Sequence, residues 1–184
     1  SIDIVDEWSS LLGKMVKVEK RTTVKVEIFR YEDMSTVAGR ESFDADIKAY
    51  SESHDLALLQ LRSKSKVPHV AVMQTKETAN SIRVFDPVVI VGCSLLHAPL
   101  ITTGEITSLN DEIDNKQYWM SNAQVVFGSS GGAVYTLRDD RWVFVGVPSR
   151  VSVVNWSTPI THMGYFVPIT RIYEWLSEEK LDFI

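Results

Sequence analysis

The chain has 184 residues, enough for one compact domain or for two small β-barrels that share an interface. Its composition, 45% hydrophobic and 23% charged, excludes an intrinsically disordered protein. A net charge of −5 argues against a general nucleic-acid or anionic-membrane partner, and no apolar stretch reaches membrane-spanning length. The single cysteine, Cys93, excludes an intrachain disulfide, and we expect it to be a small buried residue.

The first third of the chain predicts one short helix followed by strands. A helical spacing links four apolar residues near the start: Ile4, Trp8, Leu11 and Met15. Apolar and polar residues then alternate over residues 24–29 and 43–50, and residues 56–61 form an apolar run of strand length. Polar stretches at 62–66 and 74–81 follow. We therefore expect one domain over residues 1–73 and a second over residues 82–184.

The second domain is expected to consist of strands and one helix. Strand patterns occur at residues 88–91, 101–109, 118–121, 133–137, 142–147, 151–156 and 165–167. The pairs Asn110-Asp111 and Asp139-Asp140 predict hairpin turns. After Pro168, a helical stripe predicts a short C-terminal helix through Ile172, Trp175 and Leu176. Many short strands with no helices between them are typical of an antiparallel barrel or sandwich.

Residues 128–132 read Gly-Ser-Ser-Gly-Gly, which is the most informative run in the chain. A serine between glycines can be held on a tight turn, with its hydroxyl exposed and backbone N–H groups beside it. Acyl transfer needs such a nucleophile together with donors placed where the carbonyl oxygen gains charge. The pattern also fits the nucleophile elbow of an α/β-hydrolase, but that elbow leads into a helix, whereas residues 133–137 have a strand pattern. Upstream, Asp55 begins the apolar run 56–61.

With these motifs the sequence resembles the trypsin-like (chymotrypsin-fold) serine proteases, closest to the bacterial HtrA/DegP type, from about residue 24 to residue 176. The segments that carry the resemblance lie, in chain order, at 55–61, 89–92, 103–108, 121–123, 128–132, 145–147 and 164–169. The resemblance implies an all-β fold of two six-stranded antiparallel barrels with a short C-terminal helix. It implies neither a metal nor a cofactor, and it is compatible with a homo-oligomer.

The resemblance also implies roles for individual residues. Ser130 would be the nucleophile of a serine endopeptidase, and Asp55 would orient the general-base histidine. The N–H groups of Gly128 and Ser130 would form the oxyanion hole, and Ser129 would shape the turn.

The same resemblance implies where a polypeptide substrate would bind. It would add as an extended strand along the backbone of Val147, Pro148 and Ser149. Gln124 and Val125 would line the primary specificity pocket. Neither is acidic, so we expect a modest preference for apolar side chains over Lys or Arg.

The chain departs from the family in its histidines. The family's general base lies several tens of residues before the aspartate, and residues 1–53 contain no histidine. On an extended strand, the side chain of His54 would point away from that of its neighbour Asp55. His69 and His97 are expected in connections, and His162 in the loop before the last strand.

The first group also has only three convincing strands, so its barrel is incomplete over residues 1–73. We expect that the missing strands and the histidine belong to one segment that the 184 residues do not include. The alternative is a catalytically inactive pseudoprotease, or a scaffold, that binds extended peptides or a protein partner.

Overall fold

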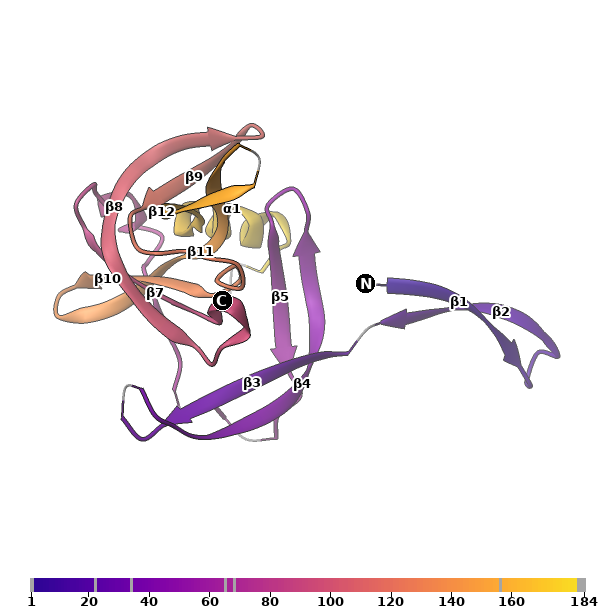
Figure 1. Cartoon of the computed structure of the whole chain (residues 1–184). Helices are drawn as coiled ribbons and strands as arrows, with labels where there is room; N and C mark the ends of the chain where they lie inside the picture. The colour runs from indigo at the N-terminus through magenta and orange to yellow at the C-terminus, as the bar shows by residue number, and fades with distance from the viewer. Residues whose placement is uncertain are drawn as a thin grey trace. The chain divides into compact units, whose positions relative to one another are not determined.

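The computed structural model describes residues 2–21, 23–33, 35–64, 66–67, 69–155 and 157–181 (Figure 1). Its contacts divide the chain into two compact units. The first comprises residues 1–48 and 58–66, and the second comprises residues 49–57 and 67–184. The predicted domain limits at residues 73 and 82 remain predictions.

The chain begins with a two-stranded hairpin of β1 (Ile2–Ser9) and β2 (Lys14–Arg21), where we had predicted a helix. That prediction was wrong because a spacing of four residues, as between Ile4 and Trp8, is shared by one face of a helix and one face of a strand. Gly13 has φ +59° in the turn, and Trp8 lies directly opposite Met15 in the antiparallel register.

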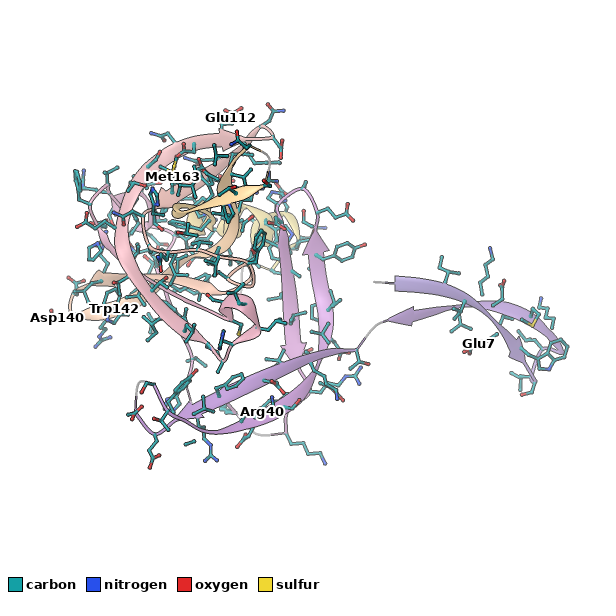
Figure 2. The ribbon with its side chains drawn as sticks, viewed as in Figure 1. Glu7, Arg40, Glu112, Asp140, Trp142 and Met163 are labelled. Atoms are coloured by element: carbon teal, nitrogen blue, oxygen red, sulfur yellow. The ribbon has the colours of Figure 1, made fainter. Side chains whose placement is uncertain are left out.

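The first unit also contains most of a three-stranded sheet in the order β3-β4-β5. Its strands are β3 (Val24–Tyr31), β4 (Val37–Ser51) and β5 (Leu56–Leu61). The alternating patterns predicted the first two, and the apolar run predicted the third. Two ion pairs join neighbouring chain segments in this unit, Arg40 with Glu27 and Arg62 with Asp46; Arg40 is labelled in Figure 2. The end of β4, the turn after it and the start of β5 (residues 49–57) group with the second unit.

The second unit is built on a closed antiparallel barrel. Hydrogen-bonded neighbours follow the order β10-β7-β8-β9-β12-β11, and a β10–β11 pairing closes a ring of six strands within the described residues. The strands are β7 (Pro87–Gly92), β8 (Leu100–Ile113), β9 (Lys116–Ser121), β10 (Ala133–Arg138), β11 (Arg141–Val154) and β12 (Thr158–Pro168). A short strand, β6 (Val72–Met73), pairs with β11 in parallel. The predicted all-β, chymotrypsin-like barrel fold is thus confirmed.

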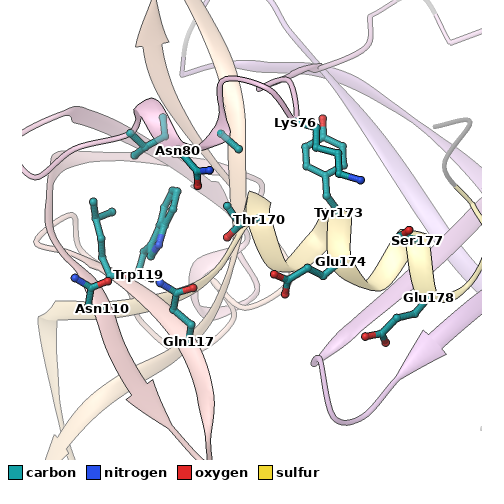
Figure 3. Close-up of a pocket in the computed structure, with 13 residues that line it drawn as sticks. Lys76, Asn80, Asn110, Gln117, Trp119, Thr170, Tyr173, Glu174, Ser177 and Glu178 are labelled. Atoms are coloured by element: carbon teal, nitrogen blue, oxygen red, sulfur yellow. Dashed lines mark hydrogen bonds between the residues drawn. The ribbon is translucent and has the colours of Figure 1, made fainter.

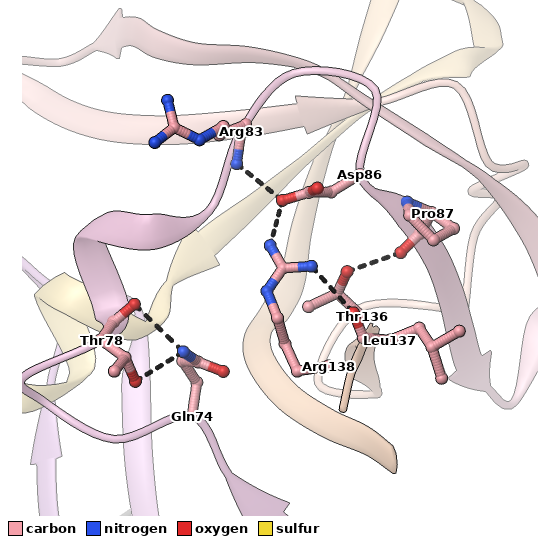
Figure 4. A network of polar contacts seen from close by, with 8 residues as sticks. All are labelled: Gln74, Thr78, Arg83, Asp86, Pro87, Thr136, Leu137 and Arg138. Atoms are coloured by element: carbon pink, nitrogen blue, oxygen red, sulfur yellow. Dashed lines mark hydrogen bonds and ion pairs between the residues drawn. The ribbon is translucent and has the colours of Figure 1, made fainter. Parts of the chain in front are cut away.

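Large apolar side chains on the barrel strands are buried. Those that are less than 2% exposed are Val88, Ile106, Tyr118, Val134, Val145, Phe166 and Val167. Phe166 and Val167 are adjacent on β12 and face opposite sides, so this strand is covered on both of its faces. Polar contacts fasten the start of β7 to the end of β10 (Figure 4). There the Thr136 hydroxyl donates to the Pro87 carbonyl (2.7 Å), and Arg138 pairs with Asp86.

The last helix, α1 (Ile169–Glu178), follows β12 without a loop. Pro168 occupies its N-cap position, where an N–H would have no partner inside the helix. The predicted stripe is confirmed, since the buried side chains are Ile169, Arg171, Ile172, Trp175 and Leu176.

Two predictions about turns had different outcomes. Asp139 and Asp140 form the β10–β11 turn with φ +47° and +58°, as predicted (Asp140 is labelled in Figure 2). Asn110 and Asp111 instead lie inside β8, and the β8–β9 turn is at Asp114-Asn115.

The expected strands at 142–147 and 151–156 are a single strand, β11, as far as Val154; Trp156 lies outside the described residues. Three short elements had no sequence prediction: β6 and the 3-10 helices η1 (Ala79–Ser81) and η2 (Ser94–Leu96).

Candidate functional site

The serine-glycine run forms a tight turn between β9 and β10 in the second unit. Gly128 has φ +93° and Gly131 has φ +79°, conformations that L-residues other than glycine rarely adopt. A Cβ atom on Gly128 would also lie 2.5 Å from the Cys93 carbonyl oxygen, whereas one on Gly131 would meet nothing within 4 Å. The turn therefore needs glycine at 128 for two reasons and at 131 for one.

Ser129 is buried and stabilises the turn through hydrogen bonds. Its side chain is 2% exposed, and its hydroxyl oxygen accepts the Val126 N–H (3.2 Å) and lies 3.1 Å from the Ser94 hydroxyl. Its carbonyl accepts the Gly132 N–H at 3.1 Å. These contacts fix the backbone on both sides of residue 130.

Ser130 is exposed, and its Oγ donates to the Ser149 carbonyl at 3.0 Å. Beside it, the Gly131 N–H donates to the Pro148 carbonyl at 2.9 Å. Within the described part of the chain, no hydrogen bond uses the N–H of Gly128 or of Ser130. Both donors of the predicted oxyanion hole are thus without a protein acceptor.

Ser149 lies at a β-bulge in β11. The register with β12 passes from Pro148–Phe166 directly to Arg150–Tyr165, so Ser149 is an extra residue on its strand. Its hydroxyl donates to the Asp55 carboxylate at 2.5 Å, while its carbonyl accepts the Ser130 hydroxyl. One residue thereby connects the two side chains that the sequence had singled out.

Asp55 lies in a turn rather than on the extended strand that we had expected. Its φ is +56°, and its N–H donates to the Glu52 carbonyl at 3.3 Å. The side chains of His54 and Asp55 are therefore not on opposite faces of a strand, as we had expected. The His54 ring contacts other groups: Nδ1 lies 2.9 Å from the Ser51 hydroxyl, and Nε2 lies 3.8 Å from the Glu178 carboxylate.

A buried arginine of α1 donates a hydrogen bond to the turn that carries His54 and Asp55. Arg171 is 4% exposed and donates to the carbonyls of His54 (3.0 Å) and Gln117 (2.8 Å). Its guanidinium lies 4.7 Å from the centre of the Tyr118 ring, and that of Arg150 lies 5.3 Å from the same centre. Arg150, which follows Ser149, and Arg171, which donates to the turn that carries Asp55, thus both lie against the Tyr118 ring.

The other histidines lie apart from these groups. His69 and His97 are exposed in connections, as expected, but His162 is an exposed residue inside β12 and not in a loop. None of the four histidines, all of which are described, hydrogen-bonds Ser130 or Asp55.

The residues expected around the substrate differ in how accessible they are. Gln124 is exposed, and its carbonyl accepts the Thr102 hydroxyl at 2.9 Å. Val125 is only 3% exposed and packs so closely on Gly164 that a Cβ there would overlap it. Val125 therefore offers little surface to a ligand. Val147 pairs with Val167 of β12.

Cys93, which we expected to be buried, is exposed; its carbonyl oxygen is the atom nearest to a Cβ placed on Gly128. Among the described residues, no group of three His, Cys, Asp or Glu side chains could hold a metal ion. No described helix is long and apolar enough to cross a membrane.

Sequence reasoning did not find two contributions to this site. It assigned Ser149 a backbone role only, and it gave Arg171 no role. An arginine in the buried stripe of a predicted helix is a usable signal, because arginine is seldom fully buried without a specific partner. The Ser149 contact had no such signal, because it depends on the register between two strands.

Comparison with known proteins identifies the fold and the family. Solved structures with a similar fold include the HtrA-type protease AlgW with a tripeptide (14% identity, TM-score 0.61), where the match covers 81% of this chain and 50% of that one. The chain thus spans about half the length of that protein. No curated protein matches the sequence. The family model for the trypsin-like peptidase domain matches residues 14–147, from the first hairpin to the middle of β11, and the chain therefore belongs to the trypsin-like peptidase family.

Proposed function

We propose that the protein is a serine endopeptidase in which Ser130 is the nucleophile and Asp55 the triad carboxylate. The observation that carries the proposal is the convergence on Ser149, which accepts the Ser130 hydroxyl and donates to Asp55. Two side chains far apart in the sequence are thereby bonded to a single residue. Trypsin-like peptidase family membership supports the same assignment.

In the proposed reaction, Ser130 Oγ attacks the carbonyl carbon of the scissile peptide and passes its proton to an imidazole, which delivers it to the leaving amine. The carbonyl oxygen, now negatively charged, accepts the N–H groups of Gly128 and Ser130. Because positive-φ glycines fix the turn, these donors need no reorganisation. Water then hydrolyses the acyl-enzyme, and no metal or cofactor takes part.

The proposed general base is a histidine outside the 184 residues. The four histidines of this chain have other surroundings, and the Ser130 proton is directed at the Ser149 carbonyl, which is not a base. Catalysis therefore requires the Ser130 side chain to rotate from that carbonyl toward the imidazole.

The proposed substrate is a polypeptide that adds as an extended strand along Val147–Ser149. Rotation of Ser130 would free the Ser149 carbonyl for a substrate N–H, so substrate binding and alignment of the nucleophile would be coupled. Gln124 and Val125 carry no negative charge, so the proposed preference at the primary pocket is for apolar side chains.

Covalent labelling with a biotinylated fluorophosphonate, with and without added imidazole, tests the nucleophile. We expect labelling that imidazole accelerates, that disappears in Ser130→Ala and that persists in Ser81→Ala, an exposed serine of the same unit. Labelling that survives Ser130→Ala would remove Ser130 from the role.

A second candidate function is a catalytically inactive pseudoprotease or scaffold that binds extended peptides or a protein partner. The observation that favours it is the absence, among the described residues, of an imidazole bonded to Ser130 or Asp55. It predicts no labelling under either condition, together with peptide binding that Ser130→Ala leaves intact.

A further inference from the structure

A second concave surface of the same unit lies beside α1 and contains neither Ser130 nor Asp55 nor Ser149. This α1 groove has a volume of about 770 Å³, within the range of ligand sites (~300–1,000 Å³). It is bordered by η1, by the paired ends of β8 and β9, and by α1 (Figure 3).

The floor of the α1 groove is apolar and its rim is polar. Ala79, Ile82 and Trp119 form the floor and are each 3–4% exposed. Three side-chain amides stand on the rim and are exposed: Asn80, Asn110 and Gln117. An apolar floor with a few convergent polar groups is typical of a recognition site.

The polar groups have unused hydrogen-bonding capacity. In the described part of the chain, the side chains of Asn80 and Asn110 make no hydrogen bond, and Thr170 Oγ1 is buried without a partner. Gln117 uses its Nε2 on the Leu109 carbonyl (2.9 Å), which leaves its Oε1 free. A side-chain amide can donate and accept at once, as a peptide group does, so these amides match a polypeptide backbone.

The rim also carries an excess of negative charge. Glu174 and Glu178 are one helical turn apart on α1 and both line the groove, against one lysine, Lys76. Such a pair of carboxylates attracts an ammonium or guanidinium group and repels phosphate.

We propose that the α1 groove binds an extended polypeptide segment that carries a Lys or Arg side chain. The amides pair with its backbone, and Glu174 and Glu178 pair with its cationic group. A neutral saccharide would leave the two carboxylates of the rim without an ionic partner. The inference is independent of the proposed protease activity, since the groove contains neither Ser130 nor Asp55 nor Ser149. Of its two carboxylates, Glu178 also lies 3.8 Å from His54 Nε2, so Glu174 is the one without this contact.

Titration by nuclear magnetic resonance tests the proposal. The probe is the blocked pentapeptide Ala-Val-Lys-Val-Ala at millimolar concentration, and its matched control has norleucine in place of lysine. We expect saturable shifts of the Trp119 indole and Gln117 amide signals, with affinity about two- to five-fold lower for the control peptide.

Protein variants decide which groups bind. Glu174→Gln and Glu178→Gln should each weaken binding of the lysine peptide about two- to five-fold, whereas Glu179→Gln, an exposed neighbour that does not line the groove, should not. Absence of saturable binding, or loss of binding in Ser130→Ala, would overturn the proposal. The proposal would also be overturned if cellotetraose caused chemical-shift changes as large as those of the lysine peptide and if Glu174→Gln and Glu178→Gln left them unchanged. Because the readout is binding, these outcomes do not depend on whether Ser130 is catalytic.

Discussion

Alanine substitutions at the three glycines of the turn at residues 128–132 should have different costs, because the surroundings of each glycine differ. Gly131 has φ +79° and open space around its Cα, so Gly131→Ala adds backbone strain alone. A non-glycine residue in the left-handed region costs about 1–2 kcal/mol. Gly132 has no positive φ, but a Cβ there would overlap the Val91 carbonyl oxygen. Overpacking of this kind costs about 1–3 kcal/mol.

Gly128 combines both penalties. Its φ is +93°, and the added Cβ would lie 2.5 Å from the Cys93 carbonyl oxygen and 3.0 Å from the Leu95 nitrogen. The contacting atoms belong to the backbone, so they cannot rotate away. We therefore expect Gly128→Ala to lower the free energy of unfolding by about 3 kcal/mol or more, the sum of strain and overlap.

Urea unfolding followed by tryptophan fluorescence is a suitable assay, because Trp119 and Trp175 are buried in the second unit. With a slope of about 2 kcal/mol/M, Gly131→Ala should lower the unfolding midpoint by about 0.5–1 M and Gly128→Ala by about 1.5 M or more. Equal losses for the two variants would refute the contact with Cys93. A Gly131→Ala variant more stable than the parent would refute the positive φ, because alanine stabilises where its backbone fits.

Three further changes test other contacts. Ser149→Ala removes one exposed hydrogen bond and should cost about 1 kcal/mol in urea unfolding; an unchanged midpoint would argue against the contact with the carboxylate. Arg171→Met leaves two part-buried carbonyls without this donor and should cost about 2–4 kcal/mol, with Lys at the same position losing less; equal stability of the Met variant would contradict this role. Backbone hydrogen bonds from Ser35 and Thr36 lower the pKa of Asp33 from 3.8 to about 2, so the folded state loses this stabilisation as the pH falls from about 4 to 2. The carboxyl carbon of Asp33, followed by nuclear magnetic resonance, should titrate with a midpoint near pH 2. Asp33→Asn should make the free energy of unfolding depend less on pH in this acid range. A midpoint near pH 4 would contradict both expectations.

The barrel could be predicted from the sequence because its strands are many, short and separated by no helices. Runs such as residues 88–91 are apolar throughout, so the prediction rested on the number and spacing of the strands. The first hairpin could not be predicted in the same way. Its apolar residues, such as Trp8 at 65% exposure, do not face an interior that would force a clean alternation. Their spacing therefore fitted a helix equally well.

The position of the β8–β9 turn was also beyond local reasoning. The sequence offers two Asx pairs close together, 110–111 and 114–115, and either can form a turn. Pairing of Ile113 with Lys116 selects the second, which leaves a two-residue connection. Tertiary pairing, rather than turn propensity, therefore decided between them.

Much of the candidate site could be predicted because it rests on local chemistry. The glycines around Ser130 are required by the turn itself, and they are visible in the sequence. The convergence of Asp55 and Ser130 on Ser149 is different, since it depends on a bulge that arises only when β11 meets β12. A single strand contains no information about the register of its partner.

The bulge gives position 149 two roles that a substitution and a deletion would affect differently. Paired residues on neighbouring strands face the same side of a sheet, so deleting Ser149 would leave Arg150 opposite Tyr165 and on the same face as before. The deletion would nevertheless remove both the carbonyl that accepts the Ser130 hydroxyl and the hydroxyl that donates to Asp55. A substitution at 149 removes only the hydroxyl, because every residue keeps its backbone carbonyl. The length of this strand is therefore under tighter constraint than the identity of its residue at 149.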